Sequence, residues 1–428
     1  MEKYLFSSFS LQDVLIFVFL RHDSSHSDIM NDLFTLQDAV RMSGPRTFNI
    51  MIKPTGSSCN LDCSYCYYLD KAVQYGGREA VMSQELLKIL VRQYCAACEA
   101  EELSFCWHGG EPLLMGIDFF RQAVQLESRY ADGRKINNSI QTNGTLINAH
   151  WCRFFAKNHF LVGISLDGPK DIHDAFRLSK SRKPTFDKVM EAVRLMRVFG
   201  VEFNTLSVVH ERCEGRGAEI YRFFRDVVKS KYQQYLPAVE HVVDAPNYHR
   251  PVIVPPEREG ARLAPWSISA KGYGQFLCDI FDQWSQGDVG RVFVQMFDAT
   301  LAGWCGVPGG VCSMGETCGD SLTVEHNGDV YCCDHFVYPH YLLGNIREQS
   351  LASIFDSAHR VQFGLDKRNS LPAECLKCEW YRVCHGECPK HRFAKGSDGK
   401  PKNYLCEGLR AFYAHVAPAM HHMAAALF

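Results

Sequence analysis

The stretch Cys59-Asn-Leu-Asp-Cys63-Ser-Tyr-Cys66 places three cysteines in one short loop of a 428-residue chain. Three thiolates at this C-x3-C-x2-C spacing can converge on one four-iron cluster, whereas an electron-transfer cluster takes four cysteines. Three leave one iron open, and an open position separates a catalytic metal from a structural one. The stretch therefore predicts a cluster that binds a small chelating ligand. The alternative is a zinc site whose fourth ligand lies elsewhere.

Segments typical of strands and helices alternate on the C-terminal side of residue 47. Six strands separated by five helices predict βαβ units, a parallel sheet and right-handed crossovers. Six units are too few for the closed eight-stranded barrel, so we expect an α/β fold with an open, partial barrel. The expected strands are 48–53, 103–107, 136–142, 161–166, 203–209 and 232–239, and the expected helices are 84–100, 117–130, 148–157, 185–199 and 218–229.

Polar or glycine-rich motifs follow the first four expected strands. The cysteine loop comes first, Gly109-Gly110-Glu111-Pro112 second, Gln141-Thr-Asn-Gly third and Ser165-Leu-Asp-Gly fourth. In parallel α/β sheets, functional residues gather at the carboxyl ends of the strands. The four motifs therefore predict one site at this edge of the sheet.

The chain divides into four parts by composition. Residues 1–46 are expected to be a poorly ordered extension, and residues 47–243 form the barrel. Residues 244–270 contain five prolines without clear periodicity, which indicates a linker or long loop. Residues 271–428 form a second, cysteine-rich domain.

Charge and hydropathy exclude several classes of partner. The net charge is -2, from 46 basic and 48 acidic residues spread along the chain, so we expect neither nucleic acid nor a membrane surface as partner. The apolar run 11–20 is too short to span a bilayer and lacks the flanks of a secretory signal. A cytoplasmic location follows, in which thiols stay reduced and nineteen cysteines indicate metal binding.

Eight cysteines beyond residue 300 have regular spacing. They occur as Cys312-x5-Cys318, then Gly328-x4-Cys333, then a group of four, then Cys406. Eight thiolates suffice for two four-iron clusters, but paired Cys-x2-Cys knuckles also build zinc sites. The spacing alone leaves both metals open. The group of four is Cys375-x2-Cys378-x5-Cys384-x3-Cys388.

Cys59–Cys66 resembles the signature of radical S-adenosylmethionine enzymes, and the later cysteines resemble the SPASM domain of those that act on peptides. The resemblance implies a partial (β/α)6 barrel with a C-terminal SPASM domain, which agrees with the strand count. It also implies S-adenosylmethionine and three 4Fe-4S clusters, one catalytic and two auxiliary. The implied ligands are Cys59, Cys63 and Cys66 for the catalytic cluster, Cys312, Cys318, Cys333 and Cys388 for auxiliary cluster I, and Cys375, Cys378, Cys384 and Cys406 for auxiliary cluster II. The implied S-adenosylmethionine contacts are Tyr65, Gly110, Ser165, Arg177 and Val239.

Further segments are similar to anaerobic sulfatase-maturating enzymes, among them Ile52-Lys53-Pro54 and Val330-Tyr-Cys-Cys-Asp334. That family oxidises a cysteine or serine of a sulfatase to Cα-formylglycine, by hydrogen abstraction with a 5′-deoxyadenosyl radical. The implied partners are a peptide or unfolded sulfatase with a Cys/Ser-x-Pro-x-Arg segment and an electron donor such as flavodoxin or ferredoxin. Asp334 matches the family's general base.

The chain departs from the family at His108, where glutamine is common. A different target peptide is therefore an alternative, with the chain acting as a radical maturase that forms thioether or carbon-carbon crosslinks. A zinc-bound binding protein without catalytic activity is another. Tyr68 lines the substrate site or is a packed aromatic of the core.

Overall fold

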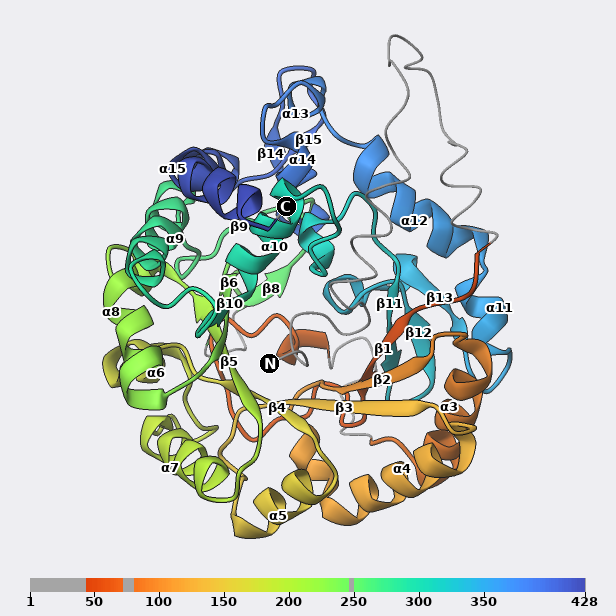
Figure 1. Cartoon of the computed structure of the whole chain (residues 1–428). Helices are drawn as coiled ribbons and strands as arrows, with labels where there is room; N and C mark the ends of the chain where they lie inside the picture. The colour runs from red at the N-terminus through yellow and green to blue at the C-terminus, as the bar shows by residue number, and fades with distance from the viewer. Residues whose placement is uncertain (1–43, 72–80, 246–249, 428) are drawn as a thin grey trace.

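The computed structural model describes residues 44–71, 81–245 and 250–427. Nearly all of the expected N-terminal extension, 1–46, lies outside them. Six parallel strands curve into an open barrel with helices on the outside (Figure 1). This confirms the expected partial barrel, and most element ends fall within two residues of the expected ones. The strands are β1 (Asn49–Lys53), β2 (Glu102–Trp107), β3 (Lys135–Thr142), β4 (Leu161–Ser165), β5 (Phe203–Val209) and β6 (Tyr232–Pro237).

The barrel helices bury one apolar face each against the strands. In α3, for example, Leu86, Leu87, Leu90 and Val91 are fully buried, at the i, i+1, i+4, i+5 spacing of an amphipathic helix. The short α6 (Lys170–Phe176) was not expected. The other helices of this layer are α3 (Gln84–Ala97), α4 (Ile117–Tyr130), α5 (Ala149–Lys157), α7 (Phe186–Val198) and α8 (Gly217–Arg222), which continues as the π-helical turn Phe223–Val228.

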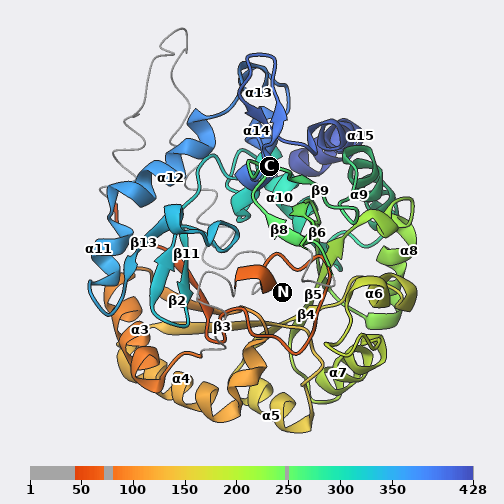
Figure 2. The same cartoon turned by 180° about the vertical axis from the view of Figure 1, so that it is seen from behind.

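The C-terminal part extends the barrel sheet at both edges. β11 (Ser321–Glu325) pairs in parallel with β1, from Asn49 with Ser321 to Lys53 with Glu325. β12 (Asp329–Tyr331) and β13 (Leu342–Asn345) continue that edge, while β10 (Phe293–Val294) pairs with β6. Figure 2 shows β11 and β13 below α12 (Ala358–Asn369), with α11 (Leu351–Phe355) on the outer side of β13. Residues from 271 onward therefore share one ten-stranded sheet with the barrel.

Residues 244–270 are not a plain linker. β7 (His241–Val243) pairs with β8 (Val252–Val254) and β9 (Arg262–Leu263) in an antiparallel sheet. Strands of two or three residues are too short to produce a periodic pattern, and prolines surround them, so the sequence pattern did not reveal them.

Two helices of the C-terminal part extend the outer ring of helices beyond α8 (Figure 1). α15 (Cys406–Ala425) packs on α9 (Ala270–Ser285), where a Cβ on Gly408 would lie 1.8 Å from the Ala270 carbonyl oxygen. Only glycine fits this contact. In the described part of the chain, no helix has the length and apolar character that crossing a bilayer requires. The remaining elements are α10 (Gln295–Trp304), α13 (Ala373–Leu376), α14 (Tyr381–Cys384), β14 (Ala394–Lys395) and β15 (Pro401–Lys402).

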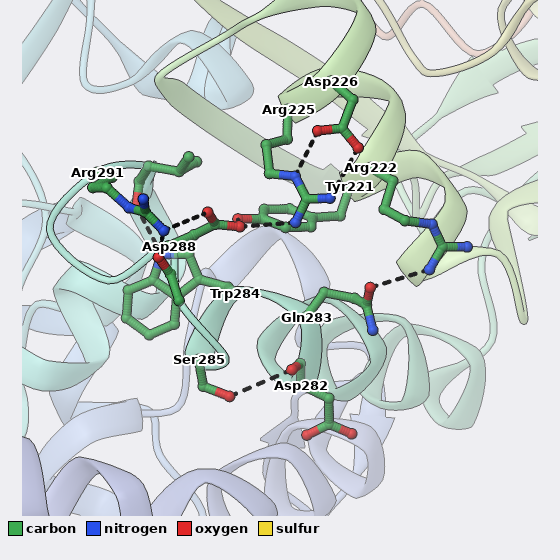
Figure 3. Close-up of polar contacts among 12 residues, drawn as sticks. Tyr221, Arg222, Arg225, Asp226, Asp282, Gln283, Trp284, Ser285, Asp288 and Arg291 are labelled. Atoms are coloured by element: carbon green, nitrogen blue, oxygen red, sulfur yellow. Dashed lines mark hydrogen bonds and ion pairs between the residues drawn. The ribbon is translucent and has the colours of Figure 1, made fainter.

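Asp288 ties the last barrel helix to the loop before β10 (Figure 3). Its Oδ2 accepts hydrogen bonds from the Tyr221 hydroxyl at 2.8 Å and from Arg225 Nη1 at 3.0 Å. Arg291 lies 3.7 Å from the other oxygen. By contrast, Asp226 binds Arg225 at the surface. The Asp288 carboxylate thus joins the helical segment before β6 to the loop before β10, and β6 and β10 are paired strands.

Asp288→Ala is expected to lower the free energy of unfolding by about 1–3 kcal/mol, because it leaves a partly buried Tyr221 hydroxyl and Arg225 without their acceptor. Asp226→Ala is the matched control and should cost at most about 1 kcal/mol, since its ion pair is exposed. Anaerobic thermal unfolding of the two variants measures the difference. Equal midpoints would contradict the assigned role of Asp288.

Candidate active site

The cysteine loop leaves β1 and is fixed by neighbours from several elements. Its backbone bonds to the end of α6, with Asp62 N donating to the Leu178 carbonyl at 2.8 Å. Cys63 and Tyr65 pack with Trp266 in a small apolar cluster. The loop thus has a defined shape at the carboxyl end of the first strand, where the sequence predicted it.

The three thiols of the loop lie in a buried, mutually interacting group. Burial, then Glu111, raises the pKa of Cys59 to about 12, and burial also raises the pKa values of Cys63 and Cys66. Cys66 and Cys59 raise the pKa of Cys63 further, so the three thiols are close enough to interact electrostatically. Buried thiols of this kind become thiolates when a metal replaces their protons. The donor set fits an iron-sulfur cluster.

The Gly109-Gly110-Glu111 segment packs against residues 56–58, which lead into the cysteine loop. A Cβ on Gly110 would lie 2.1 Å from the Ser58 carbonyl oxygen, so no other residue fits there. The fully buried Glu111 carboxylate accepts hydrogen bonds from Asn143 N and Thr142 Oγ1, both at 2.8 Å. Burial raises the pKa of Glu111 to about 7. Gly110 therefore packs against the start of the cysteine loop, and Glu111 joins its own motif to the Gln141-Thr-Asn-Gly motif.

Two of the expected S-adenosylmethionine contacts, Tyr65 and Arg177, lie together at the cysteine loop. The Tyr65 hydroxyl donates to Asp167, whose other oxygen accepts from Arg177 Nε at 3.0 Å. Ser165 Oγ accepts from Gln141 Nε2 at 2.9 Å. Although burial opposes ionisation, Arg177 holds the pKa of Asp167 below its usual value. The structure brings Tyr65 and Arg177 together through Asp167, a residue that the sequence analysis did not single out. Val239 is buried, two residues beyond β6.

The first C-terminal set of cysteines lies next to Asp334. Burial, then Asp334, raises the pKa of Cys333, and Cys388 and Cys312 raise it further. For Cys388, Cys312 and Cys318 add to the effects of burial and Glu387. The structure thus brings together the four cysteines expected for auxiliary cluster I.

The second C-terminal set lies around the start of α15. Burial, then Glu387, raises the pKa of Cys384 to about 12, with further contributions from Cys406 and Cys375, and Cys378 in turn raises the pKa of Cys406. A cavity of about 610 Å³ borders Cys406. No His, Cys, Asp and Glu side chains in the described ranges converge closely enough for a single metal ion. The cysteines that bind a four-iron cluster lie farther apart than the ligands of one ion, because each binds a different corner of a cube. The absence of a single-ion site among the described residues therefore does not exclude a cluster.

Asp334 lies among ionisable side chains from β1, β2 and the cysteine loop. The Tyr67 hydroxyl donates to its Oδ2 at 2.6 Å, and Lys53 Nζ lies 3.8 Å from the same oxygen. Burial opposes ionisation, but His335, Lys53, His108 and Tyr67 hold the pKa of Asp334 far below its usual range. Burial lowers the pKa values of both imidazoles to about 4 or less, so at pH 7 Lys53 and Tyr67 keep the carboxylate ionised.

His108 has a defined tautomer. Its Nδ1 accepts from Gly109 N–H at 2.8 Å and lies 3.3 Å from Lys53 Nζ. Both partners are donors, so the proton of the neutral ring is on Nε2. Tyr68 is buried beneath Lys53, whose Nζ lies 4.2 Å from its ring centroid. Both residues therefore belong to the surroundings of Asp334.

Lys53 and Tyr67 were not predicted as site residues. A lysine at the end of a strand is usually solvated, and only its place beside the site loops could have indicated otherwise. Tyr67 directly follows Cys66, an expected cluster ligand, which was the available signal for it.

Comparison with known proteins first defines the class. Residues 54–224 match the radical SAM superfamily, and residues 312–379 match SPASM, an iron-sulfur cluster-binding domain. With the buried cysteine loop, these matches make the chain a radical SAM enzyme with a C-terminal iron-sulfur domain. S-adenosylmethionine and iron-sulfur clusters are its cofactors, and the zinc alternative is wrong.

The relatives then define the family. The chain is 44% identical to the serine-type anaerobic sulfatase-maturating enzyme of Bacteroides thetaiotaomicron, over 87% of this chain and 90% of that protein. It is 31% identical to the cysteine-type enzyme of Clostridium perfringens, over 88% and 98%. A solved structure of native anSMEcpe with bound AdoMet has a TM-score of 0.76 at 31% identity, over 88% and 99% of the two chains.

The chain therefore belongs to the anaerobic sulfatase-maturating enzyme family. Conversion of a sulfatase serine or cysteine to Cα-formylglycine, expected from the sequence, is confirmed as its activity. The alternative of a crosslink-forming maturase is set aside by the same relatives.

Gly110→Ala is expected to displace the cysteine loop, because the added methyl overlaps the Ser58 carbonyl. S-adenosylmethionine cleavage should fall roughly 100-fold, since a displacement of about 1 Å at a reacting centre costs that much. Gly287→Ala is the control, as its Cβ would meet only the end of the Arg291 side chain. Wild-type release of 5′-deoxyadenosine by Gly110→Ala would contradict this packing argument.

Proposed function

We propose that Asp334 is the general base that takes the hydroxyl or thiol proton of the substrate side chain. The observation that supports this role is that Lys53 and Tyr67 both contact the Asp334 carboxylate. These contacts hold it ionised beside Cys333. An ionised carboxylate can accept a proton without first losing its own. Tyr67 and Lys53 also fix its orientation.

A carboxylate with a pKa as low as that of Asp334 is basic enough for the proton transfer that this oxidation requires. Oxidation of a serine CH2OH to an aldehyde removes one hydrogen atom, which the radical takes, one proton, which Asp334 takes, and one further electron, which an auxiliary cluster on the C-terminal cysteines would accept. Once the Cβ hydrogen atom has gone, the remaining hydroxyl is far more acidic than that of serine, so a carboxylate of low pKa can accept its proton. On a cysteine substrate, the same steps give a thioaldehyde, which water converts to the aldehyde with release of hydrogen sulfide.

Eleven cysteines would hold three 4Fe-4S clusters. The loop Cys59–Cys66 would carry the catalytic cluster, which with S-adenosylmethionine supplies the hydrogen-abstracting radical. Tyr65, Gly110, Ser165, Arg177 and Val239 would line the bound S-adenosylmethionine, as the resemblance implies. The buried, mutually interacting C-terminal sets support two auxiliary clusters. A flavodoxin or ferredoxin would supply the reducing electron.

The substrate would be a peptide or an unfolded sulfatase segment. Solved structures of anSMEcpe hold AdoMet together with Cp18Cys or Kp18Cys peptides, at 31% identity to this chain. Relatives at 44% and 35% identity are named serine-type. We therefore favour serine as the residue that this enzyme oxidises, in a Ser-x-Pro-x-Arg segment.

Incubation of the reduced, anaerobic enzyme with S-adenosylmethionine and a Ser-x-Pro-x-Arg peptide tests the function. Mass spectrometry should show loss of two hydrogens from the serine and an aldehyde that reacts with a hydrazine probe. Release of 5′-deoxyadenosine without any change in the peptide would argue against this substrate.

Asp334→Asn should slow peptide oxidation by roughly 100-fold to 10,000-fold, the usual contribution of a general base. S-adenosylmethionine cleavage should continue, because Asp334 is not among the residues assigned to that cofactor. Asp356→Asn is the control, since this carboxylate is exposed and pairs only with Arg46 among the contacts identified for it. Peptide oxidation at the wild-type rate by Asp334→Asn would remove the proposed base.

The serine peptide should be oxidised with a higher kcat/KM than the otherwise identical cysteine peptide. His108→Gln tests whether the ring that contacts Lys53 sets this preference. Because His108 holds one side of the Lys53 ammonium, its replacement should change the ratio of the two kcat/KM values. Steady-state rates on both peptides give that ratio, and an unchanged value would exclude His108 as a determinant.

A further inference from the structure

Lys71 lies in the short helical turn that follows the cysteine loop and is the last described residue before 81. Its backbone N–H donates to the Tyr68 carbonyl at 3.1 Å, and its side chain is 4% exposed. The ammonium lies 3.1 Å from the centroid of the Tyr338 ring. Among the described residues it has no hydrogen-bond acceptor. A buried ammonium without an acceptor is costly, so such a group usually has a partner when the protein functions.

The carboxylates nearest to Lys71 are already engaged. Asp70 accepts from Arg250 Nη2 at 2.8 Å and from Ile253 N at 2.9 Å. Glu240 forms an ion pair with Lys390. Neither carboxylate is therefore available as the counter-ion that Lys71 lacks.

Lys71 lies near two lysines, Lys53 and Lys390, that adjoin Asp334 or its partner Tyr67. Burial, then Lys390, lowers the pKa of Lys71 to about 7, and Lys53 lowers it further, against Glu240 and Asp70. Lys53 lies 3.8 Å from Asp334. Lys390 lies 4.8 Å from the centroid of the ring of Tyr67, the hydroxyl of which binds Asp334. Lys53 pairs with Asp334 and Lys390 with Glu240, so of these three lysines Lys71 alone lacks an acceptor among the described residues, which favours an electron-rich ligand.

We propose that Lys71, held over Tyr338, binds an oxygen acceptor of the substrate peptide and is a specificity-determining residue. The acceptor is a main-chain carbonyl or a side-chain carboxylate close to the residue that is oxidised. This inference rests on the proposed function in taking a peptide as the occupant of the site. The aromatic ring beneath the ammonium orients it, since a cation over a tyrosine face is itself stabilised.

Direct peptide binding tests the proposal without turnover. The holoenzyme with S-adenosylmethionine, without reductant, is titrated with a fluorescein-labelled Ser-x-Pro-x-Arg peptide that has neutral flanks, and with a second peptide that carries one added glutamate. Lys71→Met should weaken binding of at least one peptide by roughly 10-fold or more, the effect of losing a hydrogen bond to a charged group. Lys71→Arg should restore part of the affinity.

The two peptides distinguish the acceptors. A main-chain carbonyl predicts equal weakening for both, and a carboxylate predicts weakening only for the acidic peptide. Lys88→Met, on the exposed side of α3, is the control for removal of one lysine charge. Iron content and circular dichroism of Lys71→Met and Lys71→Gln establish that the variants fold.

Wild-type affinity of Lys71→Met for both peptides would overturn the proposal. Unchanged peptide binding together with an altered reduction potential of the clusters would also overturn it, and would assign Lys71 to balancing cluster charge. If the wild-type enzyme binds the peptide without oxidising it, the proposed function fails while the role of Lys71 in binding stands.

Discussion

The structure depends on one buried charge, the Lys53 ammonium at the end of β1. A lysine with no solvent exposure needs a counter-ion, and Asp334 supplies it from a part of the chain far away in sequence. β11 pairs with β1 through Lys53 and Glu325, and the β11 to β12 hairpin leads to Cys333 and Asp334. The same interaction therefore supplies a counter-ion to a buried cation, orients the candidate base and positions the neighbouring Cys333.

This arrangement explains why the cysteine-rich part cannot be an independent module. Its strands continue the barrel sheet at both edges, and α15 packs on α9 through the close contact at Gly408. The distance between the two C-terminal sets of cysteines and the cysteine loop is consequently set by backbone pairing. A flexible tether could not hold Asp334 against Tyr67 at hydrogen-bond distance.

The sequence predicted the barrel well, because each βα unit has its own local hydrophobic period and its own turn motif. The assignment of the cysteines to three clusters stays a prediction, which the local spacing of the ligands made possible. The sequence did not predict the pairing of β1 with β11, since parallel pairing between distant segments has no local pattern. β8 and β9 were not predicted, because strands of three and two residues are too short to show a periodic pattern. Lys53 and Asp167 were missed because a buried charge is recognisable only when its partner is known.

The parallel pairing of β1 with β11 also constrains how the protein is made. Asn49 leaves the ribosome long before its partner Ser321, so one edge of β1 has no neighbouring strand while most of the chain is synthesised. An open strand edge in a nascent chain is a template for association with other chains. Chaperone protection of that edge, and late insertion of the clusters after β11 docks, would give the cell a route to active enzyme that avoids aggregation.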